Sequence, residues 1–156
     1  MMQRIVNTSL GRILLHFSEN ALTRIQLTEQ PIGGDPVVGL LLDPVMACLE
    51  GIDDGREIPV NYLIGTPFQR LVWETMREIS FGQVRSYSEL AGMAGNPRAT
   101  RAVANACKNN PCPIVVPCHR VIRRDRGLGG YYWGVDMKRK LLERENIHIS
   151  PAGNVL

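Results

Sequence analysis

The spacing of apolar residues changes near Gly65, and this change limits the folds that are open to the chain. Short β-prone runs separated by turn residues come first, and they predict three strands, over 4–8, 12–17 and 23–27. After Gly65, apolar residues recur at the three- and four-residue spacings that are typical of helices. The 156-residue sequence therefore predicts an α+β fold in which a sheet precedes a group of helices.

We divide the chain into three parts, and the first boundary follows from the same change. We expect a small N-terminal sheet domain over 1–64, a helical domain over 65–150 and a tail over 151–156. Within the first domain, the glycines and prolines of 29–36 predict a loop. A short helix opened by Asp43-Pro44 is expected over 45–52, and a further strand is expected over 58–63.

Helix-start signals divide the second half. Thr66-Pro67 is an N-cap followed by a first-turn proline, and Phe68, Leu71, Val72 and Met76 are expected on one buried face. Ser86-x-x-Glu89 is a capping box that opens a helix ending at Gly95. Asn96-Pro97 predicts the start of the next helix, and a last helix is expected over 135–145.

The helix after Asn96-Pro97 has two contrasting faces. Its apolar face comprises Ala99, Val103, Ala106 and Cys107, and its polar face comprises Arg98, Arg101, Asn105 and Lys108. Two short helices joined by a tight turn are typical of a helix-turn-helix, whose second helix reads nucleic acid. A simply solvated helix face is the alternative.

Charge is distributed unevenly along the chain. Residues 1–64 hold 4 basic against 8 acidic residues, a net charge of −4, whereas residues 65–156 hold 14 basic against 7 acidic residues, a net charge of +7. A basic half is the expected footprint of a nucleic-acid binder. The sequence shows neither a membrane-spanning run nor a signal peptide, so we expect a cytoplasmic protein.

Cys118 follows a β-branched run that we expect to be a strand ending at Pro117, and His119 and Arg120 come directly after it. The thiolate is the reactive form of cysteine, and a neighbouring base would lower the pKa of the thiol. Adjacent residues of an extended segment point to opposite sides, so a turn or a water must connect Cys118 with His119. A buried, inert cysteine is the alternative. The spacing of the four cysteines is not that of a zinc site, and we expect free thiols and no metal.

The run Asn110-Pro111-x-Pro113-Ile114-Val115-Val116-Pro117-Cys118-His119-Arg120-Val121 resembles the acceptor-cysteine signature of the O6-alkylguanine-DNA alkyltransferases. The similarity extends from about Thr66 to Ile147. It implies a ribonuclease-H-like N-terminal domain and a winged-helix-like DNA-binding domain that carries the active cysteine. It also implies repair of double-stranded DNA by irreversible transfer of an alkyl group from O6 of guanine, and from O4 of thymine, to Cys118.

The resemblance implies roles for individual residues. His119 is a water-mediated base, Glu145 orients it, and Asn110 braces the turn. Tyr87 crowds the phosphate of the flipped nucleotide, and Arg101 fills the vacated place in the stack. Further DNA contacts are expected from Arg98, Ala102 and Asn105. The alkylguanine pocket is expected to comprise Cys107, Pro113, Tyr131, Tyr132 and Trp133, with the indole narrowing it.

No cofactor is required for such a transfer, and the protein is expected to act once, as a monomer. A non-catalytic alkyltransferase-like protein, which binds the lesion without repairing it, is the main alternative; such proteins replace the cysteine that this chain keeps at Cys118. An alkylation-sensing regulator and a cysteine hydrolase are less consistent with the sequence.

Overall fold

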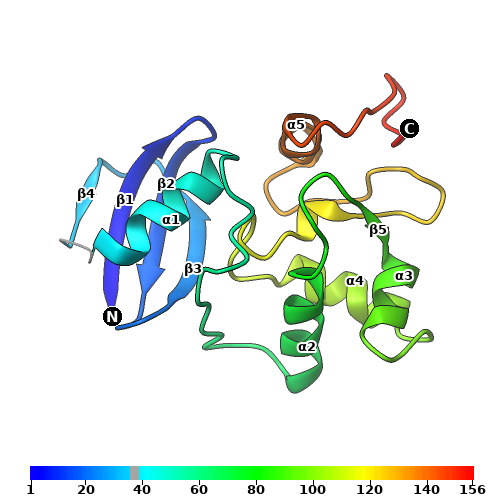
Figure 1. Ribbon diagram of the computed structural model, residues 1–156, viewed down its shortest axis with the longest axis horizontal. Helices are drawn as coiled ribbons and strands as arrows, with labels where there is room; N and C mark the ends of the chain where they lie inside the picture. The colour runs from blue at the N-terminus through cyan, green and yellow to red at the C-terminus, as the bar shows by residue number, and fades with distance from the viewer. Residues whose placement is uncertain (36–38) are drawn as a thin grey trace. The chain divides into compact units, whose positions relative to one another are not determined.

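The computed structural model describes residues 1–35 and 39–156 and combines a small antiparallel sheet with a group of helices, so the predicted α+β class is confirmed (Figure 1). The chain separates into two compact units. The first comprises 1–64 with 111–115, and the second comprises 65–110 with 116–156. The segment just before the cysteine thus returns to the first unit, and the expected tail belongs to the second. Whether these units are independent domains stays a prediction.

The first unit is built on a four-stranded antiparallel sheet of order β3-β2-β1-β4. Its strands are β1 (Met2–Thr8), β2 (Gly11–Phe17), β3 (Leu22–Leu27) and β4 (Gly33–Gly34). Ile13, Leu15 and Phe17 alternate along β2 and are fully buried, as period-2 patterning requires. Figure 1 shows helix α1 (Gly39–Leu49) crossing one face of this sheet. The three long strands predicted from the sequence are confirmed.

Three local predictions in this unit are wrong. The loop over 29–36 contains β4, which pairs with Arg4 and Ile5 because two glycines let the chain pass close to β1. Helix α1 begins at Gly39 and includes Pro44, since proline has a helical φ and removes only one backbone donor. Of the strand expected over 58–63, only a parallel bridge between Val60 and Leu22 forms.

The second unit contains helices α2 (Pro67–Met76), α3 (Tyr87–Met93), α4 (Thr100–Lys108) and α5 (Val135–Arg144). Both capping boxes are confirmed: Thr66 and Gln69 cap α2, and Ser86 and Glu89 cap α3. The Trp73 indole N–H donates to the Ala106 carbonyl at 2.7 Å and joins α2 to α4. None of the helices in the described ranges is long and apolar enough to cross a bilayer.

Two helix details differ from expectation. Leu71 is 49% exposed, and Trp73 is fully buried in its stead, because the inward face of α2 runs through Val72, Trp73 and Met76. Asn96-Pro97 does not open α4. The Ala99 N–H donates to the Asn96 carbonyl at 3.0 Å, which makes a turn, and the helix begins at Thr100 without a side-chain cap.

A short parallel pairing positions the functional segments. β5 (Arg85–Ser86) lies beside β6 (Val121–Ile122), with Arg85 opposite Val121 and Ser86 opposite Ile122. β5 leads directly into α3 at Tyr87, and β6 follows directly after the 3₁₀ turn over Cys118–Arg120. The pairing therefore brings the start of the helix-turn-helix next to the cysteine segment.

Gly65 offers a test of how tightly the entry to α2 is packed. Its φ is +93°, and an added Cβ would lie 2.5 Å from the Trp73 ring. We expect Gly65→Ala to lower the free energy of unfolding by about 2–4 kcal/mol, since left-handed strain and overpacking add. Gly95→Ala is the matched control, because its φ is +84° with no atom within 4 Å; about 1 kcal/mol is expected there. Urea titration of both variants checks this, and equal losses would contradict it.

Candidate active site

Cys118 opens the 3₁₀ turn that follows Pro117, and it is 5% exposed. Its N–H donates to the Val116 carbonyl at 2.8 Å, and the Asn110 side-chain amide donates to the same oxygen at 2.8 Å. Asn110 thus lies where a brace for the turn is needed. The strand expected before Cys118 is absent. Ile114 has φ +78°, a strained value for a β-branched residue, so the run turns instead of extending.

Glu145 is the centre of a buried hydrogen-bond cluster. Its Oε2 accepts from His119 Nε2 at 2.6 Å, and its Oε1 accepts from Arg120 Nε at 2.8 Å. The Gly82 backbone N–H also donates to Oε1, at 3.1 Å. Arg120 Nη1 donates to the Ile79 carbonyl at 2.7 Å. The helix-terminal carboxylate therefore has the partners from the cysteine segment that its position demands.

This cluster sets the protonation of His119. Burial lowers the pKa of His119, although the bond to Glu145 opposes that change. Burial would raise the pKa of Glu145, but the bonds from His119 and Arg120 outweigh it and bring the pKa to about 2. A carboxylate can only accept, so the neutral imidazole carries its proton on Nε2. Its Nδ1 is buried without a partner and is left as a free proton acceptor.

The thiol of Cys118 is not ionised by its surroundings at rest, which corrects the expectation of a lowered pKa. Burial raises the pKa of Cys118, while a hydrogen bond with Asn110 and the charge of Lys138 oppose that rise. Within the described residues, no direct hydrogen bond joins Cys118 to His119. A thiolate must therefore form during a reaction, by proton transfer through a bridging group.

A cavity of about 830 Å³ opens onto this thiol. Its lining residues are Tyr87, Ala104, Cys107, Lys108, Cys118, Arg123, Gly129, Gly130, Tyr131 and Tyr132. Gly129 has φ +74°, and an added Cβ would lie 3.0 Å from the Tyr87 hydroxyl. Glycine therefore lets the loop approach Tyr87. Burial raises the pKa of Tyr87 to about 12, so its phenol stays protonated and can donate.

Of the five residues expected in the pocket, three line this cavity and two do not. Cys107, Tyr131 and Tyr132 line it, whereas Trp133 and Pro113 are absent from its wall, and Pro113 belongs to the first unit. Trp133 packs edge-on against Tyr131, with ring centroids 6.4 Å apart. Any narrowing by the indole must act through Tyr131, and it stays a prediction.

Lys138 is a site residue that the sequence reasoning missed. It is fully buried on α5, and its ammonium donates to the Val121 carbonyl at 2.6 Å and the Gly130 carbonyl at 3.2 Å. It also lies 5.9 Å from the Tyr87 ring centroid. Burial lowers its pKa to about 8. The sequence could have indicated its burial, because Lys138, Leu141, Leu142 and Glu145 stand at positions i, i+3, i+4 and i+7, which share one face of a helix.

The expected DNA-contacting residues lie on or just before α4. Arg101, Ala102 and Asn105 are exposed on the helix, and Arg98 is exposed in the turn that precedes it. Val103 and Ala106 are fully buried on the opposite face. The structure therefore presents the predicted polar face to solvent. Among the described residues, no group of three or more His, Cys, Asp or Glu side chains could hold a metal ion.

Comparison with known proteins identifies relatives of this site. Residues 67–147 match the family model described as 6-O-methylguanine DNA methyltransferase, DNA binding domain. A probable methylated-DNA–protein-cysteine methyltransferase of Acanthamoeba polyphaga mimivirus is 54% identical over 83 residues, which cover 53% of this chain and 55% of that protein. The bifunctional transcriptional activator/DNA repair enzyme Ada of Escherichia coli is 46% identical over 101 residues, which cover 65% of this chain and 28% of that protein. The matches thus span about half the length of these curated relatives or less.

The similarity extends over both units in a solved structure. The crystal structure of Mycobacterium tuberculosis OGT in complex with DNA has a TM-score of 0.79 and 33% sequence identity, with 92% of each chain covered. The likeness therefore includes the N-terminal sheet, which the family model does not reach.

The Glu145 cluster predicts a specific loss of stability in acid. The folded pKa of about 2 lies below the ordinary value of 4.5, so the stabilisation is complete above pH 4.5 and is lost as the pH falls toward 2. That loss amounts to about 3 kcal/mol. Urea titrations between pH 7 and pH 2 should show this loss in the wild type and a much smaller one in Glu145→Gln. Glu143→Gln, an exposed change near the end of α5, should behave as the wild type does.

Lys138 predicts a change in thiol reactivity. Replacing the buried ammonium in Lys138→Met removes a charge that lowers the pKa of Cys118. We expect iodoacetamide to modify the Cys118 peptide about tenfold more slowly near neutral pH, with the pH–rate curve displaced to higher pH. The exposed Lys140→Met is the control. A slower reaction with an unchanged pH–rate curve would mean that Lys138 is only a structural support.

Proposed function

Because the chain belongs to the 6-O-methylguanine DNA methyltransferase family, we propose that it repairs DNA by moving an alkyl group from O6 of guanine to Cys118. The same chemistry extends to O4-alkylthymine, whose alkyl group is also attached to a ring-borne oxygen. The observation that carries this proposal is the thiol of Cys118 in the wall of a cavity. His119 follows it in the same turn and is bonded to the buried Glu145 at the end of α5.

The transfer begins with removal of the thiol proton. A water between Cys118 and His119 passes this proton to Nδ1, the ring nitrogen without a partner. Glu145 holds the opposite nitrogen and stabilises the imidazolium that forms, while Arg120 keeps the carboxylate ionised. His119 and Glu145 therefore allow the Cys118 thiol to ionise during the reaction, although burial favours its protonated form at rest.

Sulfur then displaces guanine from the alkyl carbon. The new bond joins Sγ of Cys118 to that carbon, the bond from carbon to O6 breaks, and its electron pair stays on the base. The Tyr87 phenol donates a hydrogen bond to the base as negative charge develops, and the proton taken from the thiol finally resides on guanine. The product is a thioether, which no side chain of the cavity can hydrolyse, so each molecule acts once.

Access to the base requires flipping, because O6 lies inside the stack of a duplex. Arg101, exposed on the polar face of α4, is long enough to occupy the vacated place, and Tyr87, the first residue of α3, lines the cavity that receives the base. Arg98, Ala102 and Asn105 contact the backbone and grooves around it. The partner is double-stranded DNA that carries the lesion.

We also propose a cytoplasmic monomer. All four cysteines are free thiols, which is the state that a reducing cytoplasm maintains.

A protein that binds the lesion without removing it is the second candidate. Such a protein needs the cavity and the helix-turn-helix but has no use for a nucleophile. The buried base behind Cys118 favours transfer, since a buried ion cluster of this kind is costly unless it has a role.

The decisive test is a mass measurement. After incubation with a duplex that contains O6-methylguanine, the Cys118 peptide should gain the mass of one CH2 unit, in a one-to-one yield with the protein. Cys118→Ala should show no gain, and in the wild type the peptide with Cys107, the other thiol of the cavity, should stay unmodified. An unmodified Cys118 peptide together with tight lesion binding would favour the second candidate.

A further inference from the structure

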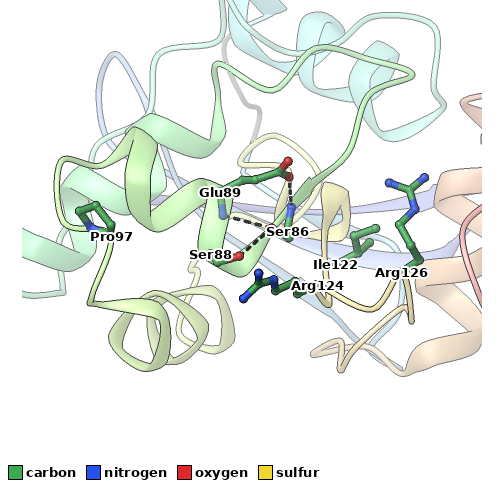
Figure 2. Close-up of a pocket in the computed structure, with 7 residues that line it drawn as sticks. All are labelled: Ser86, Ser88, Glu89, Pro97, Ile122, Arg124 and Arg126. Atoms are coloured by element: carbon green, nitrogen blue, oxygen red, sulfur yellow. Dashed lines mark hydrogen bonds between the residues drawn. The ribbon is translucent and has the colours of Figure 1, made fainter.

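A second hollow lies on the surface of the helical unit, away from the thiol. Figure 2 shows this cavity of about 500 Å³, lined by Ser86, Ser88, Glu89, Pro97, Ile122, Arg124 and Arg126. Arg124 lies beside Ser88 in this view, and Arg126 lies beyond Ile122. The hydroxyl oxygens of Ser86 and Ser88 are 3.1 Å apart. The cavity thus combines guanidinium and hydroxyl donors, the groups that bind phosphate.

The arginines come from one tight turn that follows β6. The Arg123 N–H donates to the Gly127 carbonyl at 2.9 Å, and the Arg126 N–H donates to the Arg123 carbonyl at 3.0 Å. Asp125 accepts from the Gly127 N–H at 3.0 Å, and Arg126 is in the left-handed region with φ +72°. We call residues 123–127 the arginine turn. These hydrogen bonds close the turn, so its side chains project from a defined position.

The three guanidinium groups of the arginine turn are not equally available. Arg123 pairs with Asp125 at 2.7 Å, and Arg126 donates to the Val155 and Leu156 carbonyls at 3.3 Å each. In the described part of the chain, Arg124 has neither a hydrogen bond nor an ion pair, and it is exposed. The one acidic residue of the cavity, Glu89, is engaged as the capping-box partner of the Ser86 N–H at 2.7 Å. Arg124 is therefore the free cation of this surface.

Shared lining residues connect this cavity to the thiol. A third hollow, of about 680 Å³, is lined by Tyr87, Ser88, Thr100, Arg123, Arg124 and Asp125. It shares Ser88 and Arg124 with the cavity of Figure 2, and it shares Tyr87 and Arg123 with the cavity of Cys118. The three hollows form a series that leads from the thiol, past Tyr87, to Arg124.

We propose that the arginine turn binds backbone phosphates of the strand that carries the damaged nucleotide, with Arg124 as the principal ligand. This inference rests on the proposed function. A nucleotide held in the Cys118 cavity remains covalently joined to its neighbours, so its strand must leave past the lining residues. A guanidinium binds a phosphodiester through two parallel hydrogen bonds, and the Ser88 hydroxyl can donate a third hydrogen bond. No base edge is read, so the contact is independent of sequence.

The contact acts on one strand, and this separates it from the role of Arg101. Filling a gap in the stack matters only in a duplex, whereas a phosphate of the damaged strand is present whether or not a complement is paired. Arg124→Ala should therefore slow repair of single-stranded and duplex O6-methylguanine substrates equally, by roughly 5- to 10-fold. Arg101→Ala should slow repair of the duplex more than repair of the single strand.

Free O6-methylguanine base provides the internal reference. It has no phosphate, so its reaction with Arg124→Ala should match the wild type. Arg124→Lys keeps the charge and should recover part of the loss, and Arg24→Ala, which removes an exposed arginine from β3, should have no effect. A loss confined to the duplex, an equal loss with the free base, or no loss with either DNA would each overturn the proposal.

Binding of undamaged DNA distinguishes this proposal from the proposed function. Fluorescence anisotropy with an undamaged single strand at several salt concentrations needs no alkyl transfer. Arg124→Ala should flatten the slope of log K against log salt by about 0.7, the value for one lost phosphate contact. A flattened slope without any methylation of Cys118 would preserve the phosphate site and reject the transferase. Methylation of Cys118 with an unchanged slope would support the transferase and reject the phosphate site.

Discussion

The buried carboxylate of Glu145 is the interaction on which the helical unit depends. It joins the end of α5 to the 3₁₀ turn through His119 and Arg120, and to the loop after α2 through the Gly82 N–H. A carboxylate in such a place is destabilising unless its lone pairs are matched, and here four donor contacts match them. The same bonds orient His119 and leave its Nδ1 free. The structural support and the proposed proton transfer therefore use the same hydrogen bonds.

Helix α5 organises the site through two opposite charges on its inward face. Lys138 binds the backbone carbonyls of Val121 in β6 and of Gly130, and Glu145, seven residues later, binds the turn that carries Cys118. Both ions are buried at the expense of hydration, and both are compensated by backbone or side-chain partners. Because the thiol between these supports is also buried, its pKa is raised and the protonated form is favoured. If each molecule acts once, as proposed, this burial protects the thiol against stray electrophiles.

The basic residues of the second half include two groups, one on α4 and one in the arginine turn. Arg101 and its neighbours on α4 project from the polar face of a helix, where the proposed function has them contact a duplex. The arginine turn follows β6 and adjoins the cavity series that begins at Cys118. Under the proposed function, the first contact favours flipping and the second retains the displaced strand.

The sequence alone determined the long strands, both capping boxes and the buried face of α4, because those signals are contained within a few neighbouring residues. It failed where distant residues decide the outcome. The run before Cys118 has strand propensity, yet it turns at Ile114. Leu71 is exposed and Trp73 is buried because the packing of α2 against α4 selects the buried face. Only the tertiary structure revealed Lys138 as a site residue, placed Trp133 and Pro113 outside the cavity wall, and kept Cys118 protonated. Burial and long-range charge set these properties, and neither can be read from residues adjacent in the chain.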